Sequence, residues 1–377
     1  MLDDSLLENP SALVEADTGG LLRSAATAGA QLRAAAQAAN EARLDTLSGH
    51  RPRALVLLRR PGSSGFAMEL VAALLGPDCP VPVVITDGTP SWIGPLDVLV
   101  AHTADSGDRA LAESVGRAVR RGCEVVLSAP AEGPIMAAGA GAARLLEPRV
   151  PVPPGLDFPR ALATVLVTVS ALGLLRADLD LLATDLDREL ERDHLSHDSF
   201  VNPAKSLALR LADHIPLLWG TDPPATALAG YAAATLAAHA AVVAHAADVG
   251  AAARATALQR ALVGPSRDIF HDPFDEPDGP ASSVLPAPPR VVLLATGDED
   301  PRTAVARQAG RDWPEADLLH PLEEVPPGTP VAALRRAALL ATRFDLAALY
   351  LGLAGAVLGS SARGEYPGAA TQLSGPA

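Results

Sequence analysis

Residues 55–75 read LVLLRRPGSSGFAMELVAALL: an apolar run, a glycine-serine turn, and an apolar pattern at helical spacing. A strand that enters a helix through Gly62-Ser63-Ser64-Gly65 would turn free backbone N–H groups and two hydroxyls toward one point. That point suits an anion, because the first turn of a helix has unsatisfied donors and the positive end of the dipole. An ordinary strand-to-helix turn explains the same residues, since the stretch matches neither a Walker loop nor a GxGxxG fingerprint.

Strand and helix patterns alternate after this stretch. In the first half we predict strands at 54–58, 81–86, 97–101, 124–128 and 145–150, and helices at 66–75, 107–121 and about 134–142. Residues 157–175 and 178–192 follow as two helices. In the second half IPLLWG, RVVLLATGDED and ADLLHPL predict strands, DPPATALAGYAAATLAAHAAVVAHAADVG one long helix, and 330–354 a closing helix. This order predicts an α/β fold with two parallel sheets flanked by helices.

The length of 377 residues and the 49% hydrophobic content suit two domains with sizeable cores. Aromatic residues make up only 3% of the chain, so the cores must consist of Ala, Leu and Val. We predict the following division: an N-terminal helical segment at 1–49, a first domain at 50–156, bridging helices and a linker at 157–213, a second domain at 214–354, and a flexible tail at 355–377.

Composition also excludes several classes of function. A net charge of −14 argues against nucleic acid as a partner, because phosphate backbones need a basic surface. Cys79 and Cys123 lack CxxC spacing, and the acidic opening Met1–Asp4 is unlike a signal peptide, so we expect a cytoplasmic protein. The longest apolar stretches are broken by Thr, His and Gly, so no membrane span is expected. We expect no cofactor, and no metal at His194 and His197, which lack a third ligand.

Three stretches carry a family resemblance: Gly62-Ser63-Ser64-Gly65-Phe66, DVLVAHTADSGDRALAE at 97–113, and DFPRALATVL at 157–166. They are similar to the Gly-Gly-Ser-Gly-Ile turn, the strand before Ser-Tyr-Ser-Gly-Asn-Thr, and the Pro-Arg-Ala-Ala-Leu helix start of the bifunctional phosphoglucose/phosphomannose isomerases. The resemblance covers about residues 50–355. It implies two sugar-isomerase (SIS) domains and a homodimer whose active site lies near the domain junction.

The resemblance implies a site for a hexose 6-phosphate as well. Arg160 and His271 match catalytic positions of the family. Asp105 and Asp108 in the second stretch would repel a phosphate. The residues implied in phosphate and substrate binding are Gly62, Ser63, Ser64, Gly65, Thr103, Ser106 and Arg343.

Isomerisation needs a base that carries a proton between C1 and C2. The family's glutamate base has no counterpart in AAHAAVVAHAADVGAAARATALQ at 237–259, and Arg343, which keeps its charge, replaces a lysine. His271, Asp268, Asp272 or Glu276 would have to act instead. Two functions therefore stay open. One is an aldose–ketose isomerase that converts glucose 6-phosphate or mannose 6-phosphate to fructose 6-phosphate. The other is a catalytically silent SIS protein that binds a sugar phosphate or a partner in regulation or assembly.

Overall fold

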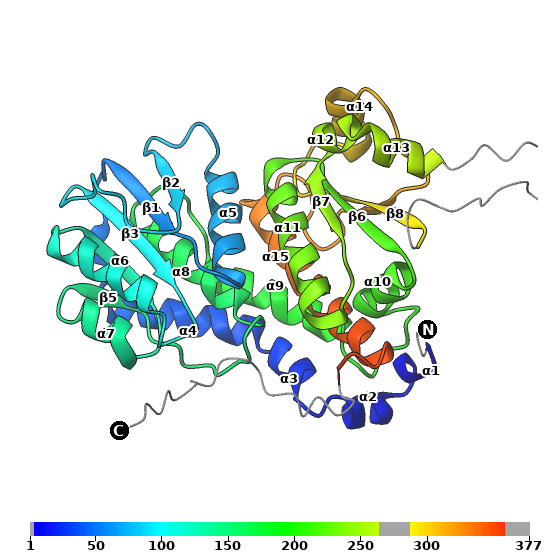
Figure 1. Cartoon of the computed structure of the whole chain (residues 1–377), viewed down its shortest axis with the longest axis horizontal. Helices are drawn as coiled ribbons and strands as arrows, with labels where there is room; N and C mark the ends of the chain where they lie inside the picture. The colour runs from blue at the N-terminus through cyan, green and yellow to red at the C-terminus, as the bar shows by residue number, and fades with distance from the viewer. Residues whose placement is uncertain (1–3, 264–286, 359–377) are drawn as a thin grey trace, which may run out of the picture.

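The computed structural model describes residues 4–263 and 287–358, which form two halves with one parallel sheet each (Figure 1). The first sheet has the order β2-β1-β3-β4-β5 and the second the order β7-β6-β8-β9. The prediction of an α/β fold with two parallel, helix-flanked sheets is thus confirmed. The strands are β1 (Ala54–Leu58), β2 (Val83–Thr86), β3 (Asp97–His102), β4 (Glu124–Ser128), β5 (Ala143–Leu145), β6 (Ile215–Gly220), β7 (His245–Asp248), β8 (Pro289–Leu294) and β9 (Asp317–Leu319).

Helices cover both sheets, and three of them, α5, α11 and α15, lie between the halves (Figure 1). The helices of the first half are α5 (Ser63–Leu75), α6 (Arg109–Arg120) and α7 (Gly133–Gly139). The bridging helices are α8 (Phe158–Ala171), α9 (Leu179–Arg192) and α10 (Pro203–Leu211). Those of the second half are α11 (Pro223–Ala240), α12 (Val249–Arg254), α13 (Thr256–Val263), α14 (Pro301–Ala309) and α15 (Ala332–Ala354).

The long helix predicted at 222–250 is wrong in its second part. The helix α11 ends at Ala240, and Ala241 adopts a left-handed conformation with φ 54°. Residues His245–Asp248 then form β7, an edge strand parallel to β6. His245 therefore lies on a strand, where its Nδ1 accepts a hydrogen bond from Trp219 Nε1 (3.2 Å). A run of alanines fits helix and strand alike, so its pattern could not locate this break. The predicted strand at 145–150 is likewise displaced, to Ala143–Leu145.

The helix α15 is the central element of the core. It is long and apolar enough to span a membrane by length and composition, but its most apolar window is entirely buried inside the protein. Helices rich in small residues can approach closely, and α15 does so against α11. A Cβ added to Gly352 would lie 2.0 Å from the backbone oxygen of His239, so only glycine fits there.

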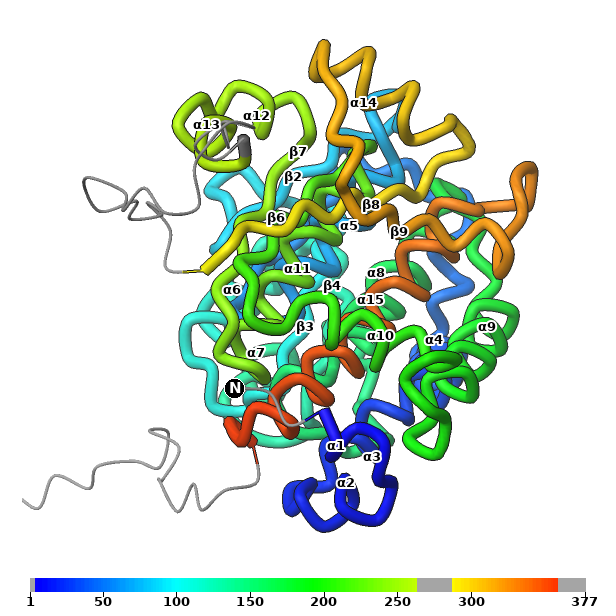
Figure 2. The backbone as a smooth tube through the Cα atoms, turned by 90° about the vertical axis from the view of Figure 1, so that its right-hand side faces the viewer, coloured from blue at the N-terminus to red at the C-terminus, as the bar shows by residue number. Residues whose placement is uncertain are grey.

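The N-terminal segment forms α1 (Asp4–Leu7), α2 (Pro10–Ala16), α3 (Leu21–Ala25) and α4 (Ala28–Glu41), followed by a 3-10 turn at Leu44–Leu47. Figure 2 shows α1, α2 and α3 gathered below the second half. Lys205, the chain's single lysine, connects this segment to the rest of the protein. Its buried Nζ donates to the carbonyl oxygens of Leu7 (2.6 Å), Leu195 (2.8 Å) and His197 (2.7 Å). One ammonium thus joins α1, α10 and the linker after α9.

We predict that Lys205→Met lowers the free energy of unfolding by about 3 kcal/mol, because three carbonyl groups lose a charged donor. Urea unfolding measures this change. Arg51→Met, at an exposed position, is the control and should shift stability by less than about 0.5 kcal/mol. A similar effect of the two substitutions would contradict the role given to Lys205.

Candidate functional site

The carboxyl ends of the first sheet's strands form a polar edge. Because the strands are parallel, the turn after β1, His102 at the end of β3 and Ser128 at the end of β4 meet there. The start of α8 adds Asp157 and Arg160 to this edge. All four of these side chains are buried. This arrangement places charged groups where open parallel sheets bind their ligands.

The turn after β1 leaves the start of α5 without a side-chain cap. Gly62 precedes the helix with φ 86° and ψ −150°, a conformation that side chains disfavour. In the part of the chain that the structure describes, no side-chain cap accepts a hydrogen bond at the start of α5. The hydroxyl of Ser64, in the first helical turn, is buried and has no hydrogen-bond partner among the described residues. The amino end of α5 thus offers donors and lacks an acceptor.

Next to this turn lies a buried chain of hydrogen bonds. His102 Nδ1 is 3.0 Å from Ser128 Oγ, and His102 Nε2 is 3.0 Å from Asp157 Oδ2. Burial alone would raise the pKa of Asp157, but hydrogen bonds from His102 and Ser63 and the charge of Arg160 lower it to about 2. Asp157 is therefore a carboxylate at neutral pH, and it orients Ser63 at the start of α5.

Arg160 lines a hollow of about 390 Å³ at the same edge. Its Nε is buried and has no hydrogen-bond partner in the described ranges 4–263 and 287–358. Burial lowers the pKa of its guanidinium, although the nearby Asp157 opposes this shift. The lining also includes Ala104, Glu132 and Glu147. An anion in this hollow would be attracted by one arginine and repelled by two glutamates.

The predicted phosphate-binding glycines and the predicted catalytic Arg160 line two different hollows. Gly62 and Gly65 line a hollow of about 440 Å³ together with Arg59 and Arg60. Arg160 does not line this hollow. The glycine-serine turn and Arg160 thus share one edge of the sheet, joined by the contacts of Asp157 with Ser63 and Arg160.

Asp108 does not act as an unpaired charge. Arg60 binds it with two hydrogen bonds, Nε to Oδ2 (2.7 Å) and Nη2 to Oδ1 (2.8 Å), and Asp108 also caps α6 through Leu111 N (2.9 Å). The predicted repulsion of a phosphate by Asp108 is therefore offset by Arg60. The sequence analysis missed this arginine, although the Arg59-Arg60-Pro61 stretch before the glycine-serine turn was a visible signal.

Thr103 and Ser106 lie in the loop after β3. The buried Thr103 accepts a hydrogen bond from Asp105 N at its Oγ1 (3.1 Å). The backbone of Ser106 packs against Gly133, where an added Cβ would lie 2.5 Å from Ser106 O. Both residues therefore shape the loop beside the site, and their role in binding stays a prediction.

Arg343 lies on α15 and is bound by two carboxylates. Its Nε donates to Glu189 Oε1 (2.6 Å) and its Nη2 to Glu324 Oε1 (3.0 Å). A phosphate would have to displace one of these carboxylates to reach the guanidinium. The predicted catalytic His271, and its alternatives Asp268, Asp272 and Glu276, lie outside the described residues. Within 4–263 and 287–358, no group of three or more His, Cys, Asp or Glu side chains could hold a metal ion.

A buried pair connects the site to α15. The Tyr231 hydroxyl of α11 donates to Asp345 Oδ1 (2.6 Å), and the Tyr231 ring stacks on Phe158 at the start of α8. Burial raises the pKa of Asp345 to about 8, although the hydrogen bond from Tyr231 opposes this shift. No local sequence pattern indicates this pair, because its members are 114 residues apart.

Comparison with known proteins supports the fold. No protein-family model matches the sequence, and no curated protein does so either. The chain is similar to a candidate phosphosugar isomerase of Clostridium difficile 630 (TM-score 0.61, 10% identity, 89% of this chain and 93% of that chain covered). It is also similar to tagatose-6-phosphate ketose/aldose isomerase of Escherichia coli (0.57, 12%, 89% and 90%). A third similar structure is the C-terminal domain of glucosamine-fructose-6-phosphate aminotransferase of Francisella tularensis (0.54, 11%, 89% and 95%).

The chain has the double-SIS fold of phosphosugar isomerases. At identities of 10–12% the similarity establishes the fold, and the activities named are those of the other proteins. The predicted SIS architecture is therefore confirmed at the level of fold.

The pair of Tyr231 and Asp345 generates a prediction about pH. Folded Asp345 keeps its proton up to about pH 8, whereas in the unfolded chain it titrates near 3.8. The folded state therefore binds more protons between these values, and this group's contribution to stability falls as the pH rises.

We expect Asp345→Asn to remove this contribution, so that the variant gains a few kcal/mol relative to the wild type between pH 5 and pH 8.5. Urea unfolding at both pH values measures the difference. An equal pH dependence of the two proteins would show that Asp345 is ionised in the fold.

Proposed function

We propose that the chain binds a hexose 6-phosphate at the carboxyl edge of its first sheet. The observation that carries this proposal is that two buried polar atoms at this edge, Ser64 Oγ and Arg160 Nε, have no hydrogen-bond partner within residues 4–263 and 287–358. Buried polar groups are rarely left without a partner, because each such group costs free energy. A ligand with several acceptor oxygens would supply the missing partners.

The charge of the edge supports a phosphate as the anionic group of this ligand. The uncapped amino end of α5 provides backbone donors and the positive end of the helix dipole. Arg60 lies beside the turn and neutralises Asp108. In this proposal the phosphate binds at Gly62–Gly65, and the sugar extends toward Arg160.

The reaction that this binding would serve is aldose–ketose isomerisation of glucose 6-phosphate or mannose 6-phosphate to fructose 6-phosphate. One observation favours the second candidate, a phosphosugar-binding protein without turnover. Both ring nitrogens of His102 are engaged in hydrogen bonds, and only 1% of this residue is exposed. The His102 imidazole at this edge is therefore occupied by protein partners.

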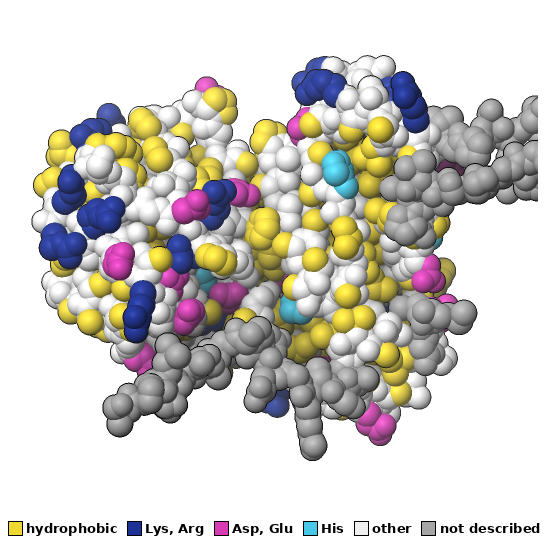
Figure 3. Space-filling model, in the orientation of Figure 1, with side chains coloured by type: hydrophobic (Ala, Val, Ile, Leu, Met, Phe, Trp, Pro, Cys, Tyr) yellow, Lys and Arg dark blue, Asp and Glu magenta, His cyan; other side chains and the backbone are white. Residues whose placement is uncertain are grey.

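The same proposal includes a homodimer in the cytoplasm. The helix α11 contains no Asp, Glu, Lys or Arg, and 79% of Val243, which follows it, is exposed. Figure 3 shows that charged side chains gather on the first half, while the face around α11 is mainly hydrophobic or uncharged. Such a surface supports association with a second copy of the chain.

Binding is tested by calorimetric titration of the wild type with glucose, mannose and fructose 6-phosphates. We expect at least one to bind, and Arg160→Ala to weaken that binding about 10- to 100-fold, because a hydrogen bond to a charged group is lost. Arg188→Ala on the exposed face of α9 is the matched control, and unphosphorylated glucose is the control ligand. Equal affinity of Arg160→Ala and wild type would overturn the assignment of this site.

Turnover is tested by a coupled assay for fructose 6-phosphate formed from glucose 6-phosphate. We expect weak or absent activity, because a missing general base costs about 10²–10⁴-fold in rate. Any activity should fall in Arg160→Ala and in His271→Ala. Rapid conversion that is unchanged by His271→Ala would show that the proton is carried by a different group.

A further inference from the structure

A hollow of about 430 Å³ lies between the N-terminal segment, which sits below the second half in Figure 2, and the helices α9 and α15. Its walls come from α2 and α3, from the end of α9 with the residues that follow it, and from α15. None of its lining residues lines the hollows of Gly62 or Arg160. It is therefore a separate cavity, with a volume in the range of small-molecule sites.

Most of this lining is apolar. The apolar side chains are those of Val14, Leu22, Ala26, Leu190, Leu195 and Leu346. Leu22 and Leu346 are buried, whereas 59% of Val14 is exposed, so part of the apolar wall is in contact with solvent. Covering such a wall is favourable only for a ligand with a hydrocarbon body, because the gain comes from removing apolar surface from water.

One buried carboxyl group, that of Asp193, lines the same hollow. Asp193 directly follows α9 and is fully buried. Its Oδ1 accepts a hydrogen bond from Ala204 N of α10 (2.9 Å), and its backbone oxygen accepts one from the Tyr350 hydroxyl of α15 (2.7 Å). Its Oδ2 is buried and has no hydrogen-bond partner among the described residues. A ligand that donates a hydrogen bond to Oδ2 would remove the cost of this unpaired acceptor.

The charges around the hollow favour a cation as this donor. Asp17 adds a second carboxylate to the lining, and this carboxylate accepts hydrogen bonds from Leu21 N (2.8 Å) and Leu22 N (2.9 Å). The hollow also lies at the carboxyl end of α9, where the helix dipole is negative. Against these groups stands Arg23, which is exposed.

We propose that this hollow binds a small primary amine with an apolar body. The ammonium group donates a hydrogen bond to Asp193 Oδ2, and the hydrocarbon part lies against the leucines. Because α2 and α3 form one wall and α9 and α15 the other, the bound amine also holds the N-terminal segment against the second half. This site is independent of the proposed hexose 6-phosphate site.

The protonation of Asp193 gives the binding a pH dependence. Burial and the charge of Glu189 raise the pKa of Asp193 to about 7, although Arg343, Ala204 N and Arg192 oppose this shift. An alkylamine stays protonated between pH 6 and pH 8, so its affinity should rise about tenfold as Asp193 ionises. The charged or titratable side chains on the elements that meet at Asp193 are Glu189, Arg192, Arg343, Lys205, Asp17, Arg23 and His194.

The test is calorimetric titration of the full chain at pH 8 with hexylamine, hexanol and hexanoate. We expect hexylammonium to bind most tightly and hexanoate most weakly. Asp193→Asn keeps an acceptor for Ala204 N but puts an amide in place of the carboxylate. It should weaken hexylammonium binding about 10- to 100-fold, because a hydrogen bond to a charged group is lost. Hexanol should be affected much less, since its hydroxyl can also accept from the amide.

Asp187→Asn is the matched control, because it makes the same substitution at a half-exposed position of the same helix, outside the hollow. It should bind hexylammonium as the wild type does. Ala26→Trp, at an exposed position of the lining, should obstruct the hollow and weaken hexylammonium and hexanol alike, and it decides the outcome if Asp193→Asn fails to fold.

The same titrations at pH 6 should show weaker hexylammonium binding by the wild type and an unchanged affinity in Asp193→Asn. Hexylammonium that fails to bind, or binds no better than hexanoate, would overturn the proposal. Equal affinity of the wild type and Asp193→Asn, or of the wild type and Ala26→Trp, would do so as well.

Discussion

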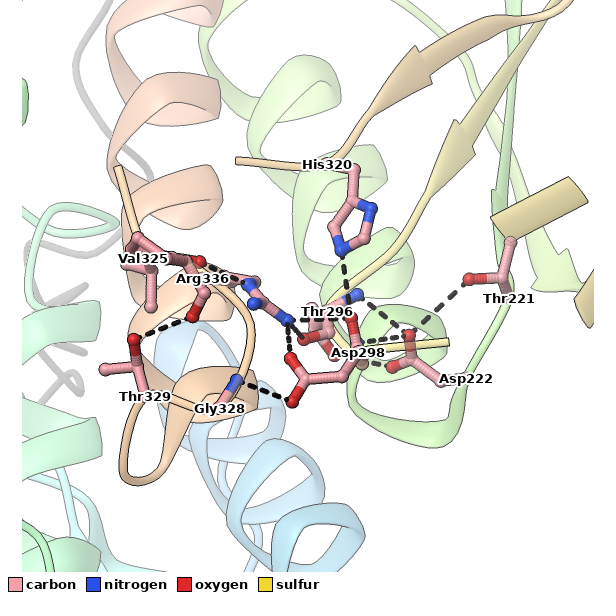
Figure 4. A network of polar contacts seen from close by, with 11 residues as sticks. Thr221, Asp222, Thr296, Asp298, His320, Val325, Gly328, Thr329 and Arg336 are labelled. Atoms are coloured by element: carbon pink, nitrogen blue, oxygen red, sulfur yellow. Dashed lines mark hydrogen bonds and ion pairs between the residues drawn. The ribbon is translucent and has the colours of Figure 1, made fainter. Parts of the chain in front are cut away.

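Each half of this protein must find acceptors for the N–H groups at the start of the helix that follows its first strand. These groups cannot be satisfied within the helix, and they carry the positive end of its dipole. In the second half the Asp222 carboxylate accepts a hydrogen bond from Ala225 N at the start of α11. It also accepts one from Gly297 N, so it connects α11 to the loop after β8 (Figure 4). In the first half Gly62 has no side chain that could accept hydrogen bonds from the start of α5. Asp157 lies beside the turn without capping the helix. The two halves therefore share a topology and differ in how the start of this helix is capped.

The composition of the core imposes a second constraint. With few aromatic residues, the interior is filled by alanine and leucine, and helices such as α15 and α11 must approach until backbones touch. Charged groups on such a helix have no route to water, so each needs a partner nearby. Arg343 pairs with Glu189 of α9 and with Glu324, and Arg335 pairs with Asp185 of α9 through two hydrogen bonds. These ion pairs fix α15 against the bridging helix.

Much of the fold could be predicted from the sequence, because strands such as Ala54–Leu58 and helices such as Leu179–Arg192 have clear apolar patterns. The edge strand β7 could not, since an alanine-rich run has no period that separates strand from helix. In the candidate site, the glycine-serine turn and Arg160 are predictions that rest on local motifs. The pairs Arg60–Asp108 and His102–Asp157 were missed because their members are 48 and 55 residues apart and meet only in the folded chain.

The protonation states around the first-half edge favour binding over turnover. A group that moves a proton between sugar carbons must reach the sugar and must change its protonation near neutral pH. Asp157, with a pKa of about 2, stays ionised and accepts hydrogen bonds from His102 and Ser63. Asp345 has a pKa of about 8, but it is buried against Tyr231 on α15. Among the described residues of this edge, His102 and Asp157 are thus engaged with protein partners, and neither is free to carry a proton in the proposed site.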